Sequence, residues 1–206
     1  MKTPLLCDIG NTTLHFRDER RDFRVGVEGF DPASVREPVA YICVNPKMEL
    51  LLRGREGWTD LGECVDRAPY YETMGIDRIA ACEAMEEGVI VDAGSAVTVD
   101  VVRNGRFEGG FIYPGLEAME RCYAQISPRL EYSFNFELDL DKMPKNSRDA
   151  ISYGYLRLLW NEVTRSGGPI ILTGGDAERF APLFPSAVVD RDLIFKGMKK
   201  IWEHRC

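Results

Sequence analysis

The chain has 206 residues, of which 45% are hydrophobic and 29% charged, a composition typical of a folded protein with one large or two small domains. Its 26 basic and 33 acidic side chains give a net charge of −7, which argues against a nucleic-acid partner because phosphate backbones require a basic surface. The sequence has no apolar run near the roughly 18 residues of a membrane helix, and no signal-peptide stretch. We therefore expect a cytoplasmic protein without a membrane partner.

Cysteine and histidine limit the possible chemistry. In an unsecreted chain, irregularly spaced cysteines without a Cys-x-x-Cys pair are expected to be reduced core residues, not a disulfide or zinc framework. Only His15 and His204 are present, so carboxylates are expected to carry any catalysis. The six cysteines are Cys7, Cys43, Cys64, Cys82, Cys122 and Cys206.

Strands and helices alternate in the first half of the predicted structure. Apolar runs predict strands at residues 5–9, 14–16, 23–27 and 39–44. Helices are expected at about residues 47–53 and 77–87.

The same alternation continues in the second half. Strands are predicted at residues 89–91, 97–102, 107–112 and 169–172, with a hairpin turn at Asn104-Gly105. Helices are predicted at about residues 115–126, from Ser147 as an N-cap, and at 192–204. The expected apolar face of the helix after Ser147 consists of Ile151, Tyr155, Leu158, Leu159 and Val163.

One pattern occurs twice. A strand ending in Asp-x-Gly appears at Asp8-Ile9-Gly10 and again, 84 residues later, at Asp92-Ala93-Gly94. The repeat predicts two duplicated α/β domains, residues 1–87 and 88–206, with a ligand cleft between them.

Three glycine-containing turns are candidate nucleotide-binding elements. Backbone amides near glycine can approach phosphate, and the Asp8 carboxylate is a suitable Mg²⁺ ligand. Taken alone, Asp8-Ile9-Gly10-Asn11-Thr12 is more simply a hairpin turn, but the second copy makes a paired site more plausible. Thr173-Gly174-Gly175-Asp176 follows a strand and opens a helix, as either a nucleotide site or a plain turn would.

Five ordered motifs from about Leu5 to the last helix resemble those of the type III pantothenate kinases, within the actin, Hsp70 and sugar-kinase superfamily. Besides the first turn, they are Gly75-Ile76-Asp77-Arg78, the stretch from Asp92 to Asp100, Gly109 to Gly115, and Asn146 to Gly154. Ser95 and Ser147 stand where threonine is commoner in the family, so each keeps only the hydroxyl.

The resemblance implies two actin-like (ribonuclease H-like) domains and ATP-dependent phosphorylation of pantothenate, the first step of coenzyme A synthesis. It also implies Mg²⁺, a monovalent cation (K⁺ or NH₄⁺) and a homodimer. Asp77 is expected to be the catalytic base, Asp8 to hold Mg²⁺ and Asp92 to hold the monovalent cation. The expected ATP-binding residues are Asp8, Gly10, Asn11, Thr12, Gly94, Ser95, Ala96, Gly174 and Gly175. The expected substrate-binding residues are Tyr70, Tyr71, Gly75, Ile76, Asp77, Arg78 and Ser147.

Several alternatives remain open from the residues alone. Asp77 could cap a helix while Arg78 forms a surface ion pair, and either Tyr70 or Tyr71 could contact the substrate. The helix from Ser147 could pack only on its own sheet. At the level of function, the alternatives are another small-molecule kinase or phosphohydrolase of the superfamily and a non-catalytic nucleotide-binding regulator, such as a transcription accessory factor.

Overall fold

The computed structural model describes residues 4–206, except for the side chain of Arg205. The chain forms two compact units: unit 1 comprises Met1–Met85 with Asp192–Cys206, and unit 2 comprises Glu86–Arg191. The predicted division differs in one respect, because the C-terminal helix belongs to unit 1 and not to the second domain. Within residues 4–206, no helix has the length and apolarity needed to cross a membrane.

Unit 1 is built on a mixed five-stranded sheet with the order β3-β2-β1-β4-β5. Strand β1 pairs antiparallel with β2 and parallel with β4. Odd-numbered residues of β1 pack in a core with helix α1, so the intervening Asp8 points to the opposite face of the sheet. The strands are β1 (Leu5–Ile9), β2 (Thr13–Arg17), β3 (Asp22–Gly26), β4 (Val39–Cys43) and β5 (Trp58–Asp60).

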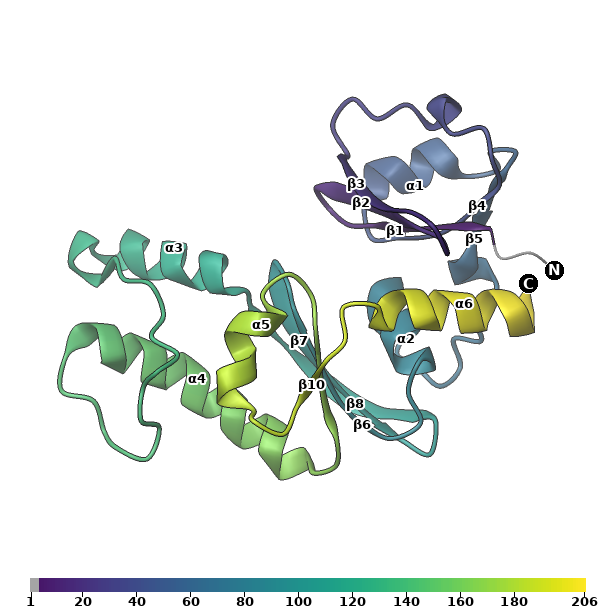
Figure 1. Ribbon diagram of the computed structural model, residues 1–206. Helices are drawn as coiled ribbons and strands as arrows, with labels where there is room; N and C mark the ends of the chain where they lie inside the picture. The colour runs from purple at the N-terminus through teal and green to yellow at the C-terminus, as the bar shows by residue number, and fades with distance from the viewer. Residues whose placement is uncertain (1–3) are drawn as a thin grey trace. The chain divides into compact units, whose positions relative to one another are not determined.

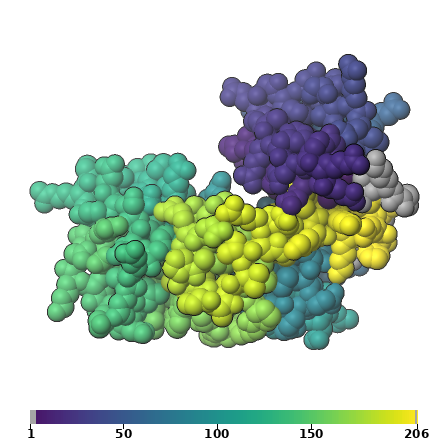
Figure 2. Space-filling view, in the orientation of Figure 1, coloured from purple at the N-terminus to yellow at the C-terminus, as the bar shows by residue number. Residues whose placement is uncertain are grey.

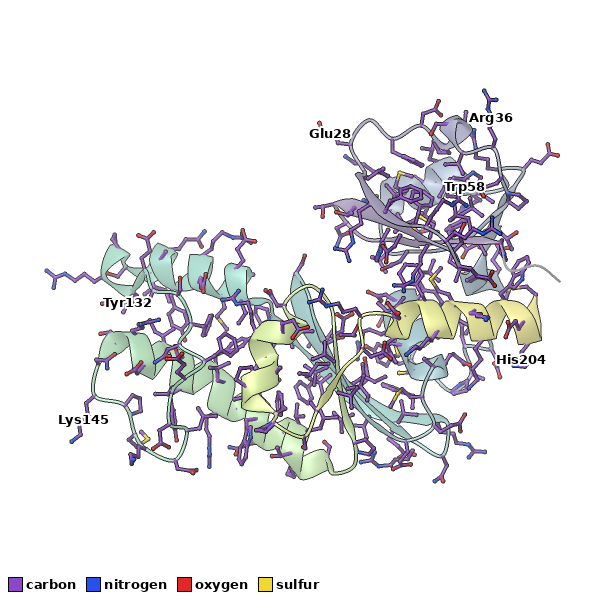
Figure 3. The ribbon with its side chains drawn as sticks, viewed as in Figure 1. Glu28, Arg36, Trp58, Tyr132, Lys145 and His204 are labelled. Carbon is purple, nitrogen blue, oxygen red and sulfur yellow. A yellow bond between two sulfur atoms is a disulfide. The ribbon has the colours of Figure 1, made fainter. Side chains whose placement is uncertain are left out.

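Aromatic side chains fill much of the core of unit 1. The ring of Phe16 stacks on Phe23 at 5.0 Å between centroids, and Trp58 packs edge-on against Phe16 at 6.3 Å. Figure 3 labels Trp58 among these side chains. Strand β5 escaped the sequence prediction because its three residues are too few to show an alternating pattern.

The helices of unit 1 are α1 (Pro46–Leu52), α2 (Ile76–Glu83) and α6 (Leu193–Arg205), with short 3₁₀ turns η1 (Pro32–Ser34) and η2 (Leu61–Glu63). Helix α6 lies against α2 (Figure 1) and also contacts β1, where Figure 2 shows the yellow helix beside the purple strands. At the closest approach of α6 to α2, a Cβ atom on Gly197 would overlap the carbonyl oxygen of Ala80. Only glycine permits this approach of two backbones.

Unit 2 repeats the topology of unit 1, with the strand order β10-β9-β6-β7-β8. The predicted duplication of an α/β unit is therefore confirmed. Asn104 and Gly105 both have positive φ, 52° and 68°, as the predicted hairpin turn requires. The strands are β6 (Gly88–Ala93), β7 (Ala96–Arg103), β8 (Arg106–Pro114), β9 (Ile170–Thr173) and the short β10 (Val188–Val189), which the sequence pattern did not reveal.

Helices α3 (Leu116–Ile126), α4 (Ser147–Ser166) and α5 (Ala177–Phe180) belong to unit 2, with the 3₁₀ turns η3 (Pro128–Leu130) and η4 (Ala181–Leu183). The prediction that Ser147 caps α4 is wrong, because the Asn146 side chain accepts the bond from the backbone N–H of Asp149, at 2.9 Å. Leu158 is also not on the buried face: it is 56% exposed, and Leu156 is buried in its place.

The prediction of six reduced core cysteines is wrong in two respects. Cys64 and Cys206 form a disulfide, and Cys122 is exposed. The pairing was hidden because 142 residues separate the two cysteines, which come together only when α6 returns to unit 1.

Candidate active site

The β1–β2 turn of unit 1 presents the first predicted nucleotide-binding residues. The Gly10 N–H donates to the Thr13 carbonyl at 2.9 Å, which closes the turn and leaves Asn11 and Thr12 exposed. The Asn45 amide holds the turn, since its Nδ2 donates to the Asn11 carbonyl at 2.9 Å. The Oδ1 atom of the same Asn45 side chain caps α1. One side chain therefore fixes the turn to the start of α1.

Two carboxylates, Asp8 and Asp77, lie close together in unit 1. The pKa of Asp8 is raised to about 7, mainly by burial and in addition by the negative charge of Asp77. Burial also raises the pKa of Asp77, although the Arg78 backbone N–H, which donates to Asp77 Oδ1 at 2.8 Å, opposes the shift. Such a pair can hold a proton at neutral pH or bind a cation through its oxygens.

Arg78 is buried, which rules out the alternative of a surface ion pair. Its guanidinium donates to the Tyr71 hydroxyl and lies 5.6 Å from the centre of the Tyr71 ring. Nor does Asp77 cap α2: the N-cap is Gly75, and Asp77 lies inside the first turn. The structure thus brings Asp77, Arg78 and Tyr71 together at the beginning of α2.

Tyr70 and Tyr71 have different surroundings. The Tyr70 hydroxyl donates to Glu83 at 3.1 Å, near the end of α2, whereas Tyr71 contacts Arg78 and is 43% exposed. Arg67 supports the segment that carries both tyrosines by donating to the Met74 carbonyl at 2.7 Å. Of the two, Tyr71 is the better placed to meet a ligand beside Arg78.

Three turns of unit 2 converge on the end of β6. The Gly115 N–H donates to the Ser95 carbonyl at 3.0 Å, and the Asp176 N–H donates to the Ala93 carbonyl at 2.9 Å. Gly174 has a φ of +88°, and a Cβ atom there would overlap the Asp92 carboxylate and the Ala93 backbone. The predicted residues Gly94, Ser95, Ala96, Gly174 and Gly175 are therefore assembled in one place.

Asp92 belongs to a row of oxygen-bearing side chains across the sheet. In the strand register, Asp92 is opposite Thr98 on β7 and opposite Thr173 on β9, so the three side chains share one face. The Thr98 Oγ1 atom is buried without a hydrogen-bond partner among the described residues. An unsatisfied buried hydroxyl beside a carboxylate fits a cation with oxygen ligands.

The remaining predicted residue, Ser147, is exposed at the start of α4 in unit 2. Within the described part of the chain, no cluster of three His, Cys, Asp or Glu side chains is arranged to hold a metal ion.

Comparisons with known proteins show the family to which the chain belongs. The profile of the type III pantothenate kinase family matches residues 61–166, which include Tyr71, Asp77, Arg78 and Asp92. A type III pantothenate kinase of Sulfurimonas denitrificans is 61% identical over 96% of both chains. The chain belongs to the type III pantothenate kinase family. A family member from Campylobacter jejuni is 39% identical over 96% of this chain and 95% of its own.

Solved structures agree on the fold. A Campylobacter jejuni protein, described as a candidate Baf family transcriptional activator, matches with a TM-score of 0.85 and 38% identity over 97% of both chains. A Sinorhizobium meliloti protein, described as a candidate 2-dehydro-3-deoxygalactonokinase, has a TM-score of 0.56 at 10% identity, covering 97% of this chain and 95% of its own. The second likeness concerns the fold alone, and it confirms the predicted actin-like class.

Sequence reasoning missed three residues of the candidate site. Asn45 could have been noticed as an Asn-Pro helix start, but nothing in the sequence links it to Asn11. Thr98 lies inside the Asp92–Asp100 motif, but the motif alone assigns it no role, and Thr173 is predicted only as part of a turn. Their position beside Asp92 follows from strand register, which the sequence does not specify.

The raised pKa of Asp8 predicts a pH-dependent cost to stability. An unfolded Asp ionises near 3.8, whereas native Asp8 keeps its proton up to about pH 7. The stabilising contribution of the protonated form is thus complete below pH 3.8 and is lost as the pH rises through 7. Asp8→Asn should raise Tm at pH 8 by several degrees, corresponding to up to about 4 kcal/mol. The difference should shrink toward pH 4.

Thermal unfolding of both proteins between pH 4 and pH 8 measures this effect. Asp18→Asn is the matched control, because the pKa of Asp18 is lowered to about 2 by its hydrogen bonds with Arg21 and should give no such gain at pH 8. An Asp8→Asn variant with the same Tm difference at every pH would contradict the assignment.

Proposed function

We propose that the chain transfers the γ-phosphoryl group of ATP to the hydroxyl of pantothenate, the first step of coenzyme A synthesis, in the cytoplasm. The observation that carries the proposal is the grouping of Asp77, Arg78 and Tyr71 at the beginning of α2, with Asp8 close by. This grouping is part of a chain that is 61% identical to a type III pantothenate kinase.

Asp77 acts as the general base. It accepts the proton of the pantothenate hydroxyl as the hydroxyl oxygen attacks the γ-phosphorus and ADP leaves. Burial raises the pKa of Asp77, which strengthens its carboxylate as a proton acceptor. The buried Arg78 binds the pantothenate carboxylate through its planar guanidinium, and Tyr71 orients Arg78. Gly75 and Ile76 shape the backbone before Asp77.

ATP is bound by the glycine-containing turns. Asn11 and Thr12 donate side-chain hydrogen bonds, and the backbone at Gly10, Gly94, Ser95 and Ala96 lies close to the phosphates. Gly174 and Gly175 leave room for the adenosine. Asp8 holds Mg²⁺, which neutralises charge on the phosphates when bound. Oxygen donors are the ligands that this ion prefers, so the Asp8 carboxylate fits it.

Asp92 holds a monovalent cation, K⁺ or NH₄⁺, with the Thr98 hydroxyl as a second oxygen ligand. The unsatisfied buried Oγ1 of Thr98, opposite Asp92, supports this assignment. When bound, the cation would offset the negative charge of the phosphates that the neighbouring Gly94-Ser95-Ala96 turn binds.

The functional unit is a homodimer in which Ser147 reaches the pantothenate of the partner subunit. The exposed face of helix α4 supports this proposal: Leu158 lies on it, and a Cβ atom on Gly154 would meet nothing within 4 Å. A bare glycine in the middle of a helix costs about 1 kcal/mol relative to alanine, and close packing of a second helix would explain its presence.

A non-catalytic regulator is the competing function, since the Campylobacter jejuni structure with a TM-score of 0.85 is described as a candidate transcriptional activator. Pantothenate-dependent ATP consumption distinguishes the two, because a regulator would bind nucleotide without turnover.

Asp77→Asn is expected to lower kcat by about 10²- to 10⁴-fold while nucleotide affinity stays close to wild type, because only the proton acceptor is lost. A coupled ADP-release assay with pantothenate, together with calorimetric ATP binding, measures both. Glu72→Gln, an exposed carboxylate on the same segment, is the control and should keep full turnover. A folded Asp77→Asn enzyme with more than about a tenth of wild-type kcat would exclude the role.

Turnover is expected to require K⁺ or NH₄⁺. In Na⁺ buffer with Mg²⁺ present, activity should be lost, and Thr98→Val should raise the half-saturating K⁺ concentration about ten-fold through loss of one ligand. Thr59→Val, an exposed threonine of β5, serves as the control. Full activity in Na⁺ alone would remove the cation from the mechanism.

Subunit mixing tests the shared site. Asp77→Asn and Ser147→Val chains, each poorly active alone, should recover about a quarter of wild-type activity after 1:1 exchange, because half the dimers contain one intact site. Mixing either with the double variant leaves no intact site and should give no recovery. A monomer with full activity, seen by light scattering at assay concentration, would refute the dimer.

A further inference from the structure

We propose that Cys64 and Cys206 form a reversible disulfide that controls the affinity for pantothenate. Their Cα atoms are 5.6 Å apart, an ordinary distance for a disulfide, although 142 residues separate them in the sequence. The inference rests on the proposed function, because it concerns regulation of the same site.

Cys64 stands at the beginning of the segment that carries Tyr70 and Tyr71. It follows η2 directly, and residues 65–75 then lead to α2 without a helix or strand. Within this segment, the bonds are local: Arg67 donates to the Met74 carbonyl at 2.7 Å, and the Met74 N–H donates to the Tyr71 carbonyl at 3.0 Å. Toward α2, the Tyr70 hydroxyl donates to Glu83 at 3.1 Å, and Arg78 donates to the Tyr71 hydroxyl. A segment without helix or strand is sensitive to how its two ends are anchored.

Helix α6 anchors both ends of this segment. The far end of the segment continues into α2, which contacts α6 where the backbones of Gly197 and Ala80 approach each other. The near end of the segment, at Cys64, is bonded covalently to Cys206, the residue that follows α6. Figure 3 labels His204 on the last turn of this helix. Opening the disulfide releases the near end while the helix contact remains.

The chemistry is thiol–disulfide exchange with a small disulfide of the glutathione type. The exposed Cys206 thiolate attacks one sulfur of the small disulfide and releases one thiolate. Cys64 then attacks the Cys206 sulfur of the mixed disulfide and releases the second. The two cysteines lose two electrons and two protons, which the small disulfide gains as two thiols; excess small thiol reverses the reaction.

The consequence differs between the two substrates. Pantothenate is bound with the help of Tyr71 and Arg78, so a loosened segment should weaken its binding. The proposed ATP-binding turn at residues 8–12 is held by bonds to Thr13 and Asn45, outside this segment, and the turns at residues 92–96 and 173–176 belong to unit 2. ATP binding should therefore change little.

Full-length protein equilibrated with glutathione and glutathione disulfide in varying ratios tests the proposal. Alkylation and mass spectrometry count the free thiols, hydrogen exchange follows residues 65–75, and steady-state kinetics give KM for each substrate. Reduction should speed exchange in residues 65–75 and raise KM for pantothenate about three-fold or more, with KM for ATP unchanged. Cys206→Ser should behave like reduced wild type at every ratio. Cys122→Ser, which removes an exposed free thiol in α3, should respond like wild type.

Six alkylated cysteines at every glutathione ratio would overturn the disulfide. A disulfide that forms without changing either the exchange of residues 65–75 or KM for pantothenate would overturn the regulation and leave the proposed function standing. Absence of pantothenate-dependent turnover in both redox states would refute the proposed function; thiol counting and hydrogen exchange would still test the disulfide and its hold on residues 65–75.

Discussion

The approach of α6 to α2 in unit 1 is the constraint on which the candidate active site depends. Helix α2 carries Asp77 and Arg78 in its first turn, but it has only eight residues and no side-chain cap at Gly75. Such a short helix is marginal by itself, so tertiary packing must hold it. The glycine at position 197 lets the two backbones meet, and α6 also contacts β1, the strand that carries Asp8. The same helix therefore supports both elements that carry the paired carboxylates.

The second unit has the same sheet topology, but its corresponding aspartate has different neighbours. In each sheet, the residue before the end of the first strand is acidic, and its side chain points away from the main helix-covered core: Asp8 in β1 and Asp92 in β6. In unit 1, burial raises the pKa of the acidic residue, and a neighbouring second carboxylate adds to the rise. In unit 2 its cross-strand neighbours are two threonines. A duplicated scaffold thus places two aspartates in different surroundings, because the neighbouring strands and helices differ.

The sequence predicted the duplicated strands, the turns and most helices because each has a local signal: apolar runs, Asp-x-Gly and Asn-Gly. Strands β5 and β10 are too short for such a pattern. The start of α4 was placed one residue late, because Asn146 and Ser147 are both good capping residues. Long-range relations were out of reach for a physical reason: Asn45 bonds to Asn11, Thr98 faces Asp92 and Cys64 bonds to Cys206 only after strands and helices have packed.

Unit 1 consists of two segments, Met1–Met85 and Asp192–Cys206, which the ribosome makes at different times. Unit 2 is a continuous stretch, Glu86–Arg191, and its whole sequence is available before residues 192–206 are translated. Unit 1 lacks α6 until Asp192–Cys206 has been made, so the domain that starts first is completed last. Since domains fold as units during translation, we expect the paired carboxylates of unit 1 to come into position only after residues 192–206 have been made. A nascent chain that stops before Asp192 can thus contain a finished second unit and no working active site.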